Sequence, residues 1–229
     1  MQVWRGLLDV WRRPSLVLTS WLLATLFGFL CGGIFYDLQD DLPGIQNRAG
    51  ALFFTLVFLA FLSVTSIDSL LTERTVVHKE QRLGYYPAAL YVLAKALIDA
   101  LLMRAIPAVL FSAPLYFLAG FRGDRERYAL FTFVVIAFTI GAQLQAMLIV
   151  EWSARAGNAM VVFVLVLIVQ MLLAGNLVNS DSIPSFFESI QFTSLFYYAF
   201  EALAINEFQV QPRAPCSMRP DLRCGHVFS

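Results

Sequence analysis

Long uncharged stretches dominate the pattern of hydrophobic and polar positions along this chain. Four of them contain no Asp, Glu, Lys or Arg over a length that can span a bilayer, namely 14–36, 49–67, 128–150 and 156–180. A fifth, 105–121, lies at the short end of the roughly 17–25 residues that a membrane-spanning helix needs. None alternates with the period of two that is typical of membrane β-strands. The pattern therefore predicts an all-α membrane protein, a polytopic bundle of five transmembrane helices.

Two of the predicted spans are longer than their uncharged stretches, because they include charged residues near the membrane boundary. A charge at the bilayer centre costs about 2.5–3.5 kcal/mol on insertion scales, and far less near an interface. Asp68 is therefore accepted close to the end of the second span. The predicted transmembrane helices are 14–36, 49–71, 96–121, 128–150 and 156–180.

Composition supports the membrane class. Hydrophobic residues make up 59% of the 229 residues and charged residues only 14%, whereas about 25% of the residues in a soluble domain are charged. The mean hydropathy is +0.70. The 16 basic and 16 acidic residues leave no net charge, so the placement of the charges, rather than their sum, carries the information on topology.

Basic residues gather in two segments of the chain. Three arginines precede the first span, and a charged island at 72–86, "TERTVVHKEQRLGYY", lies between the second and the third. The loop 37–48 is acidic instead. The positive-inside rule places the N-terminus and the island in the cytoplasm, and 181–229 outside the cell. The loop "FRGDRER" disagrees with the positive-inside rule, because this topology places its three arginines outside the cell.

Three segments outside the spans are assigned by their own composition. Residues 1–13 place apolar side chains at helical spacing, which predicts an interfacial elbow helix along the inner leaflet. A flank that only sets topology is the alternative. The aromatic-rich region 181–229 is too charged to span and too apolar for a free loop, so we expect re-entrant helices in the outer leaflet and an extracellular loop. Cys216 and Cys224 fall in this region, where a disulfide between them is expected.

The third span carries charges that a membrane helix normally avoids. Lys95 and Asp99 are four residues apart on one helical face, which predicts an ion pair. Arg104 lies about 13 Å further along the axis than Lys95. It either reaches back to the interface or pairs inside the bundle with Asp68 or Asp99, and a topological anchor is the alternative to a functional role. Gln143, in the fourth span, is a neutral polar group that needs a partner on another helix or water.

The sequence lacks the common motifs for chemistry. It contains no G-x-x-x-x-G-K-[ST] phosphate loop, no H-E-x-x-H, no G-x-S-x-G and no Cys/His spacing for a metal. The chain therefore cannot cradle ATP through such a loop. We expect no catalytic residue, no metal site, no cofactor bound to this chain and no nucleic-acid partner.

Five motifs in a fixed order carry a family resemblance. They are "GIQNRAGALFF", "HKEQRLGYYP", "LIDALLMRAIP", "LAGNLVN" and "FYYAFEALAINEF". In order and spacing they resemble the membrane domain of the G subfamily of ABC transporters, the white/pigment and multidrug-exporting half-transporters with a type-2 exporter transmembrane domain. The resemblance covers 1–224 and implies that 1–229 is a partial domain of this type. The family's nucleotide-binding domain and its sixth span are missing from it.

The resemblance also implies roles for individual residues. In the family, the first cytoplasmic loop holds a short coupling helix that docks on the ATPase domain. Its implied contact charges here are Glu73, Arg74, Lys79 and Glu80. The residues implied to contact substrate in a central cavity are Phe61, Arg104, Ile168, Met171, Asn176 and Leu177. Phe61 would clamp flat substrates, and Leu177 would belong to a plug in which Asn176 replaces the family's second leucine.

These expectations combine into one functional prediction. The chain would be the transmembrane subunit, or a fragment of one, of an ATP-driven exporter of a lipophilic small molecule or lipid. ATP and magnesium would bind a separate nucleotide-binding domain. The partners would be that domain, the lipid bilayer and a second half-transporter, in a homo- or heterodimer at the plasma membrane. The alternative is a truncated, non-transporting or regulatory membrane protein that pairs with full-length half-transporters.

Overall fold

The computed structural model describes residues 14–36, 42–83, 93, 95–121, 125–153, 155–174 and 192–208. These residues form helices and turns, with no strand among them. The helices are α2 (Pro14–Ile34), α3 (Leu42–Val64), α4 (Ser66–Arg82), η1 (Asp99–Ala105), α6 (Ile106–Leu118), α7 (Arg125–Trp152), α8 (Ala156–Leu172) and α10 (Leu195–Phe208). The predicted elbow helix, the plug residues Asn176 and Leu177, and the predicted disulfide between Cys216 and Cys224 lie outside the described residues.

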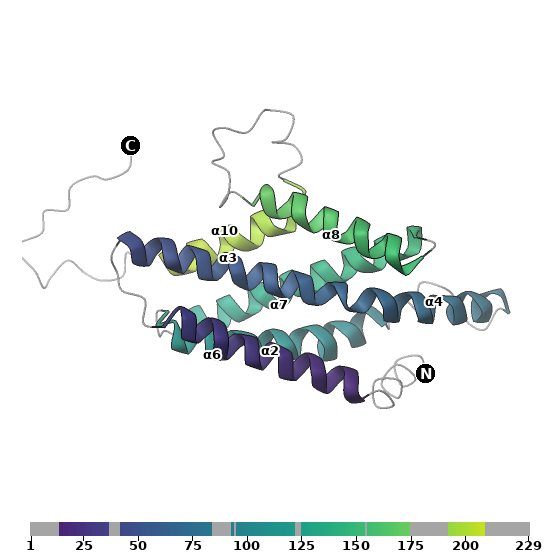
Figure 1. Cartoon of the computed structure of the whole chain (residues 1–229), viewed down its shortest axis with the longest axis horizontal. Helices are drawn as coiled ribbons and strands as arrows, with labels where there is room; N and C mark the ends of the chain where they lie inside the picture. The colour runs from purple at the N-terminus through teal and green to yellow at the C-terminus, as the bar shows by residue number, and fades with distance from the viewer. Residues whose placement is uncertain are drawn as a thin grey trace, which may run out of the picture.

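The helices run side by side in an elongated bundle (Figure 1). We call the end that carries the described part of the charged island, residues 72–83, the island end. The opposite end, where α3 begins and α10 ends, is the far end. Helices α2, α6 and α8 run from the island end to the far end, and α3 and α7 run the other way.

Four helical segments within the described residues are long and apolar enough to cross a membrane. They are Val17–Ile34, Gly44–Glu80, Lys95–Leu118 and Arg125–Trp152. The multi-pass, all-helical prediction agrees with this finding. The fifth predicted span corresponds to α8, whose 17 residues lie at the lower limit of about 17 for a spanning helix. The count of five, like the re-entrant helices, stays a prediction.

The second span is much longer than its sequence pattern indicates. Gly44–Glu80 forms one helical segment of 37 residues, interrupted only by a turn at Thr65. At about 1.5 Å per residue it is about 55 Å long, whereas the hydrocarbon core of a bilayer is about 30 Å thick. The predicted boundary at residue 71 is therefore not the end of the helix. The island continues this helical segment as α4, which makes the segment longer than the hydrocarbon core is thick.

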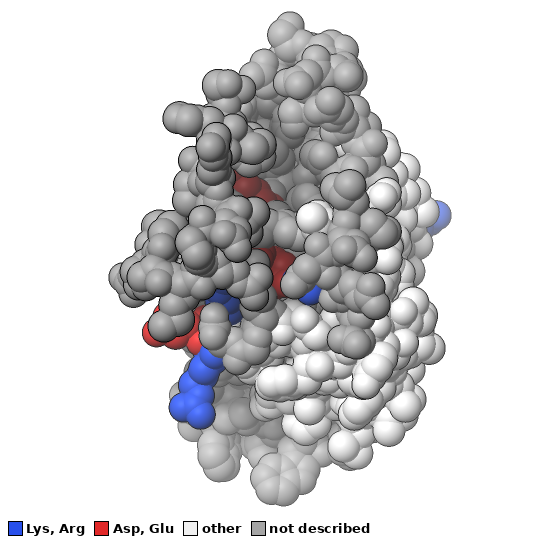
Figure 2. All heavy atoms as spheres, turned by 90° about the vertical axis from the view of Figure 1, so that its left-hand side faces the viewer, with Lys and Arg blue, Asp and Glu red and all other residues white. Residues whose placement is uncertain are grey.

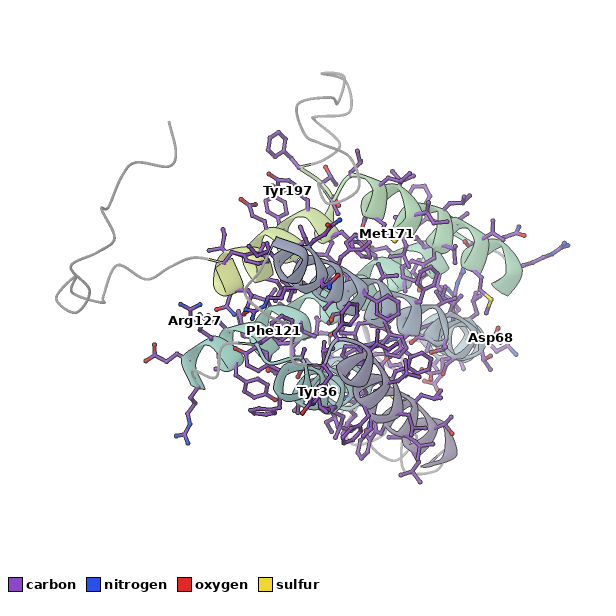
Figure 3. All side chains as sticks on the ribbon, turned by 60° about the vertical axis from the view of Figure 1, so that its left-hand side comes forward. Tyr36, Asp68, Phe121, Arg127, Met171 and Tyr197 are labelled. Atoms are coloured by element: carbon purple, nitrogen blue, oxygen red, sulfur yellow. The ribbon has the colours of Figure 1, made fainter. Side chains whose placement is uncertain are left out.

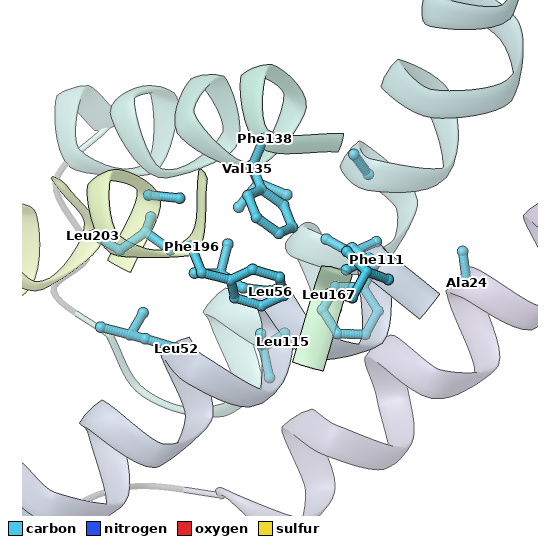
Figure 4. Close-up of a cluster of buried hydrophobic side chains, with 14 of the residues drawn as sticks. Ala24, Leu52, Leu56, Phe111, Leu115, Val135, Phe138, Leu167, Phe196 and Leu203 are labelled. Atoms are coloured by element: carbon cyan, nitrogen blue, oxygen red, sulfur yellow. The ribbon is translucent and has the colours of Figure 1, made fainter. Parts of the chain in front are cut away.

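A buried hydrophobic cluster joins α3, α6, α7, α8 and α10 (Figure 4). Its largest fully buried side chains are aromatic, and each buries a large apolar area. Phe138 of α7 and Phe196 of α10 meet edge to face with ring centroids 4.9 Å apart. Phe58 of α3 stacks on Phe111 of α6 at 5.0 Å. These contacts fix the relative positions of the helices that carry the polar groups described below.

Helix α2 approaches α6 very closely near the far end. A Cβ atom at Gly28 would lie 2.7 Å from the Phe111 carbonyl oxygen, and one at Gly32 would lie 2.9 Å from Leu118 Cβ. Only glycine allows the two backbones to come this near, as at small-residue helix interfaces in membranes. The small-xxx-small pattern of "GFLCG" is therefore a close contact in the structure.

A buried ion pair and two hydrogen bonds connect the helices at the far end of the bundle. Arg48 of α3 donates from Nη1 to Glu207 Oε1 of α10 at 2.8 Å, and the two side chains are 9% and 3% exposed. Arg127 of α7 donates to the Asn206 carbonyl, and the Asn206 amide donates back to the Arg127 carbonyl. In a view onto this end, the described charged side chains gather on one side, and the other side is almost free of charge (Figure 2).

Candidate functional site

A cavity of about 330 Å³ lies near the island end of the bundle. It is enclosed by α2, the α3–α4 segment, η1 and the start of α6, with one contribution from α7. Its described lining residues are Thr19, Ser20, Leu23, Leu59, Leu62, Thr65, Ser66, Ser69, Leu70, Glu73, Lys95, Asp99, Met103, Arg104, Pro107 and Thr139. Ten of these residues are polar or charged and six are apolar, so the wall is more polar by residue type than that of a common ligand pocket.

Lys95 joins two carboxylates at one side of this cavity. Its Nζ lies 2.7 Å from Glu73 Oε2 of α4 and 3.4 Å from Asp99 Oδ1 of η1. Ser69 donates a further hydrogen bond to Glu73 Oε1. The i, i+4 pair that the sequence predicts between Lys95 and Asp99 is present. The sequence did not indicate Glu73, which ties the same lysine to α4.

Arg104 is buried beside the cavity and bonds to neutral groups. Its Nε and Nη2 donate to Gln143 Oε1 of α7 at 3.1 and 2.6 Å, and its Nη2 also donates to Ser66 Oγ of α4. Only 5% of the residue is exposed. The amide of Gln143 thus finds the interhelical partner that a polar group in a membrane helix needs. Arg104 links three helices without a hydrogen bond to a carboxylate among the described residues.

A seven-residue π-helix orients Arg104. In η1 the hydrogen bonds run from residue i to i+5, as the bond from the Ile106 N–H to the Leu101 carbonyl shows. In an α-helix, two residues five positions apart lie about 140° apart around the axis. The wider π-helix brings them nearly above one another, so Asp99 and Arg104 line the same cavity. Such π-segments occur frequently at functional sites.

Pro107 leaves the Leu102 carbonyl of this segment without its helical hydrogen bond. In an i to i+5 pattern, the N–H of residue 107 would bond to the carbonyl of Leu102, but proline has no N–H. Trp21 Nε1 of α2 donates to that carbonyl instead, at 3.1 Å. A buried carbonyl without a partner is costly. The indole of Trp21 therefore supplies the missing hydrogen bond of the Leu102 carbonyl and at the same time holds α2 against η1.

A second polar cluster binds the island to the end of α7. Arg74 donates from Nη1 to the carbonyls of Val150 and Ser153, both at 2.6 Å. Val150 lies in the last turn of α7 and its carbonyl also accepts from the Ser153 N–H at 3.2 Å, and Ser153 directly follows the end of the helix, where side chains commonly satisfy carbonyl groups. Glu151 Oε2 lies 3.7 Å from Arg74 Nε and 3.8 Å from His78 Nε2. The guanidinium therefore acts as a C-terminal cap and braces α4 on α7.

Comparison with known proteins identifies the family. Residues 2–208 match the sequence model described as "ABC-2 type transporter". The chain belongs to the ABC-2 type transporter family. It is 32% identical over 205 residues to "ABC transporter G family member 24" of Dictyostelium discoideum, covering 89% of this chain and 18% of that protein. It is 31% identical over 202 residues to the pig "Broad substrate specificity ATP-binding cassette transporter ABCG2", covering 88% and 31%.

A yeast relative extends this pattern. The chain is 30% identical over 204 residues to "Probable ATP-dependent permease" of Saccharomyces cerevisiae, covering 89% of this chain and 19% of that protein. The ABC-2 chain thus spans between 18% and 31% of the length of these three relatives. The resemblance to the G subfamily is confirmed, and the chain is homologous to the membrane domain of such transporters.

The structure separates the residues that the family resemblance assigns to substrate contact in this ABC-2 chain. Arg104 lines the cavity, whereas Phe61 on α3 and Ile168 on α8 are exposed, at 42% and 39%. Met171 packs against the hydrophobic core and lies between α8 and the body of the bundle (Figure 3). Asp68 lies at the edge of the bundle on the exposed side of α4, outside the cluster around Arg104.

The four charges assigned to coupling also divide into two pairs. Glu73 and Arg74 make the internal contacts to Lys95 and to the end of α7. Lys79 is exposed, and Glu80 is half-buried. Between one and two turns of helix along the island thus separate the side chains that make internal contacts in the ABC-2 domain from Lys79, which is exposed, and Glu80, which is half-buried.

Besides the contact of Glu73 with Lys95, sequence reasoning missed four features of the ABC-2 domain. They are the bond from Arg104 to Ser66, the π-helix, the Arg74 cap on α7 and the buried Arg48–Glu207 pair. One signal for the π-helix was available, because Pro107 follows a charged helix in "LIDALLMRAIP" and removes a backbone donor. No local signal pairs Arg48 with a residue 159 positions away.

Proposed function

We propose that this chain is the membrane-spanning part of an ATP-driven exporter of the G-subfamily type, which moves a lipophilic small molecule or lipid across the membrane. Membership of the ABC-2 family and the G-family names of two of its relatives support this assignment. ATP and magnesium bind a nucleotide-binding domain outside this chain, and a second half-transporter completes the assembly. The island faces the cytoplasm, as does the N-terminus, in the plasma membrane.

The long α3–α4 segment carries the proposal. It runs from the far end, through the membrane and into the charged island as one helical segment of 37 residues. Arg74 fixes its protruding part to α7 through the carbonyls of Val150 and Ser153. A contact on the exposed part of the island is therefore passed directly to a helix that spans the membrane. This is the arrangement that coupling to an ATPase domain requires.

A charge swap on the island tests this coupling. The double variant Lys79→Glu/Glu80→Lys keeps the number and the sum of the charges, so the topology signal is preserved. A docking surface, however, depends on the position of each charge, because like charges that face each other across an interface are penalised. We expect substrate-stimulated ATPase activity of the complete, reconstituted transporter to fall in the swapped variant while its basal ATPase activity remains.

Arg125→Glu/Glu126→Arg is the matched control. These two residues are also adjacent and oppositely charged; both are exposed, and they lie at the far end. The control should leave stimulation unchanged. Full stimulation in the Lys79/Glu80 variant, with normal membrane insertion, would show that the island is a solvated surface without a coupling role.

The substrate route lies on the exposed faces of α3 and α8 in this proposal. Phe54, Phe61, Thr65, Asp68 and Thr72 follow each other by seven, four, three and four residues and are all exposed, so they form one stripe along α3 and α4. On α8 a similar stripe includes Leu165, Ile168 and Leu172. A second half-transporter would cover both stripes and enclose a cavity between the two copies.

Phe61→Ala tests this route. Loss of a stacking ring costs about 1 kcal/mol beyond area burial, which corresponds to roughly a fivefold loss of affinity for an aromatic substrate. Phe133→Ala is the control, because Phe133 is an exposed phenylalanine of α7, 68% accessible. Transport of a flat aromatic substrate should fall in the first variant and not in the second, at equal surface expression. Equal transport by both variants would remove Phe61 from the route.

A further inference from the structure

Every exposed side chain in the middle of α7 is apolar. Between Glu126 and Glu151, the exposed residues are Ala129, Leu130, Phe133, Ala137, Leu144 and Leu148. The polar residues of the same stretch are buried or half-buried instead, namely Thr132, Thr139, Gln143 and Gln145. The exposed residues follow each other by one, three, four, seven and four positions, so they share one face of the helix. We call this face the α7 stripe.

Trp152 continues the α7 stripe at the island end. It follows Leu148 by four residues and is 93% exposed, more than any other large hydrophobic side chain of the described residues. The indole N–H of Trp21 donates to the Leu102 carbonyl, whereas that of Trp152 donates to no group within the described part of the chain. A large ring with an unused donor suits a boundary that is apolar on one side and wet on the other.

The length of this apolar face matches the bilayer. From Leu130 to Trp152 the helix rises about 33 Å, and the hydrocarbon core of a bilayer is about 30 Å thick. The exposed charges of Glu126 and Glu151 stand at its two ends. Lipid chains offer no hydrogen-bond partner, so a face without exposed polar groups fits them. The stripe along α3 and α4 fits them less well, because it exposes Asp68.

Neighbouring helices place polar groups at the level of Trp152. Arg74 of α4 donates to the carbonyls of Val150 and Ser153, one on each side of Trp152 in the sequence, and a guanidinium is costly inside hydrocarbon. On α8, which runs in the opposite direction, Asn158 is exposed in the first turn. Polar groups of three helices therefore lie near the level at which the α7 stripe ends.

We propose that the α7 stripe faces the acyl chains of the bilayer and that Trp152 anchors α7 at the level of the lipid ester groups. The ring packs on the first carbons of the chains, and its N–H donates to an ester or phosphate oxygen. Because Arg74 binds the carbonyls on either side of Trp152, this anchor also sets the depth of α4. Lys79, five residues further along α4, lies about 7.5 Å outside that level. The inference holds whichever side of the membrane the island end faces, and it does not depend on the transport function proposed above.

Photo-crosslinking of the full-length protein in nanodiscs of dioleoylphosphatidylcholine tests the position of Trp152. The photoreactive residue p-benzoyl-phenylalanine, placed at position 152, bonds to its nearest neighbour, and tandem mass spectrometry locates that bond. We expect a phospholipid adduct through the glycerol or the first acyl carbons. At the position of Leu144, about 12 Å deeper on the stripe, the adduct should lie further along the acyl chain. At the position of Lys79 we expect no lipid adduct.

Thermal unfolding distinguishes a membrane anchor from a packing residue. Trp152→Gln removes the ring, and Trp152→Tyr keeps an aromatic residue of the kind enriched at membrane boundaries. In detergent both variants should melt like the unmodified protein, because the 93% exposed ring packs on little of the bundle and a micelle adjusts its boundary to the protein. In nanodiscs the melting temperature of Trp152→Gln should fall, and that of Trp152→Tyr should stay close to the original value. Arg155→Gln, which changes an exposed residue of the same loop, is the control and should change neither.

Several results would overturn the proposal. A protein adduct in place of a lipid adduct at position 152 would mean that a second copy or another domain covers this face. Adducts confined to the ends of the acyl chains would place the ring inside the hydrocarbon core and contradict an anchor at the boundary. Equal melting of Trp152→Gln and the unmodified protein in nanodiscs would contradict the anchor as well, even if the photoreactive residue were not tolerated.

Discussion

The two ends of the bundle bury charge in different ways. At the far end, Arg48 and Glu207 form a direct pair at 2.8 Å between packed helices. At the island end, one lysine serves two carboxylates, and Arg104 bonds to neutral groups beside a cavity. The difference indicates two roles for buried charge in one membrane domain. The far-end pair joins two helices through opposite charges, whereas Arg104 joins η1, α4 and α7 through hydrogen bonds to neutral side chains.

Arg48→Ala should have the largest effect on stability. The variant removes the guanidinium that Glu207 accepts from, and removal of one partner of a buried ion pair costs about 3–5 kcal/mol. The double variant Arg48→Met/Glu207→Leu removes both charges and should regain most of that loss. Thermal unfolding of the detergent-purified protein measures both. If Arg48→Ala has the same melting temperature as the unmodified protein, the far-end pair does not stabilise the bundle.

Gln143→Leu tests the island end in the same assay. It removes the amide acceptor of Arg104 while the cavity keeps its shape, and a hydrogen bond to a charged group is worth about 1.5–3 kcal/mol. Gln145→Leu is the control two residues along α7, because the buried Oε1 of Gln145 has no hydrogen-bond partner within the part of the chain that the structure describes. The control should be neutral or stabilising. Equal destabilisation by both would mean that the bond to Arg104 contributes nothing specific.

Gly28→Ala tests the tight contact between α2 and α6. The new Cβ would lie 2.7 Å from the Phe111 carbonyl oxygen and 2.8 Å from Pro114 Cγ, and overpacking of this kind costs about 1–3 kcal/mol. Gly33→Ala on the same helix meets nothing within 4 Å and should be tolerated. Loss of thermal stability in the Gly33 variant as well would assign the effect to the helix itself rather than to the contact.

Trp21→Phe should have the smallest effect. It keeps most of the apolar contact of the ring but removes the hydrogen bond to the Leu102 carbonyl, which is worth about 0.5–1.5 kcal/mol. The same melting assay should show a small decrease, and hydrogen exchange should rise at the amides of η1. A drop as large as that of Arg48→Ala would contradict the view that α2 is held mainly by its contact with α6.

The helices could be predicted from the sequence because their signal is local. Runs without charged residues predicted the membrane segments, and the spacing of four residues predicted the contact between Lys95 and Asp99. Their ends were less predictable. The boundary drawn at residue 71 follows hydropathy, but α4 continues to Arg82 because its backbone hydrogen bonds do not depend on side-chain polarity.

The site could be predicted only in part because it depends on long-range partners. Arg104 was recognised as unusual from its place in an apolar span. Its bond to Gln143 instead of to Asp68 follows from the way η1 rotates the side chain towards α7. Glu73 and Arg74 belong to one charged run with Lys79, and only the packing of α4 against its neighbours decides that the first two face inward.

The far-end pair gives the α3–α4 segment the properties of a lever. Arg48 and Glu207 hold it near one end, and its helical segment of 37 residues is about 55 Å long. Glu80, at the opposite tip, lies about 48 Å along the axis from Arg48, so a tilt of about 5° around that fixed point moves it by about 4 Å. Because Arg74 ties α4 to the carbonyls of Val150 and Ser153, such a displacement would carry the end of α7 with the island.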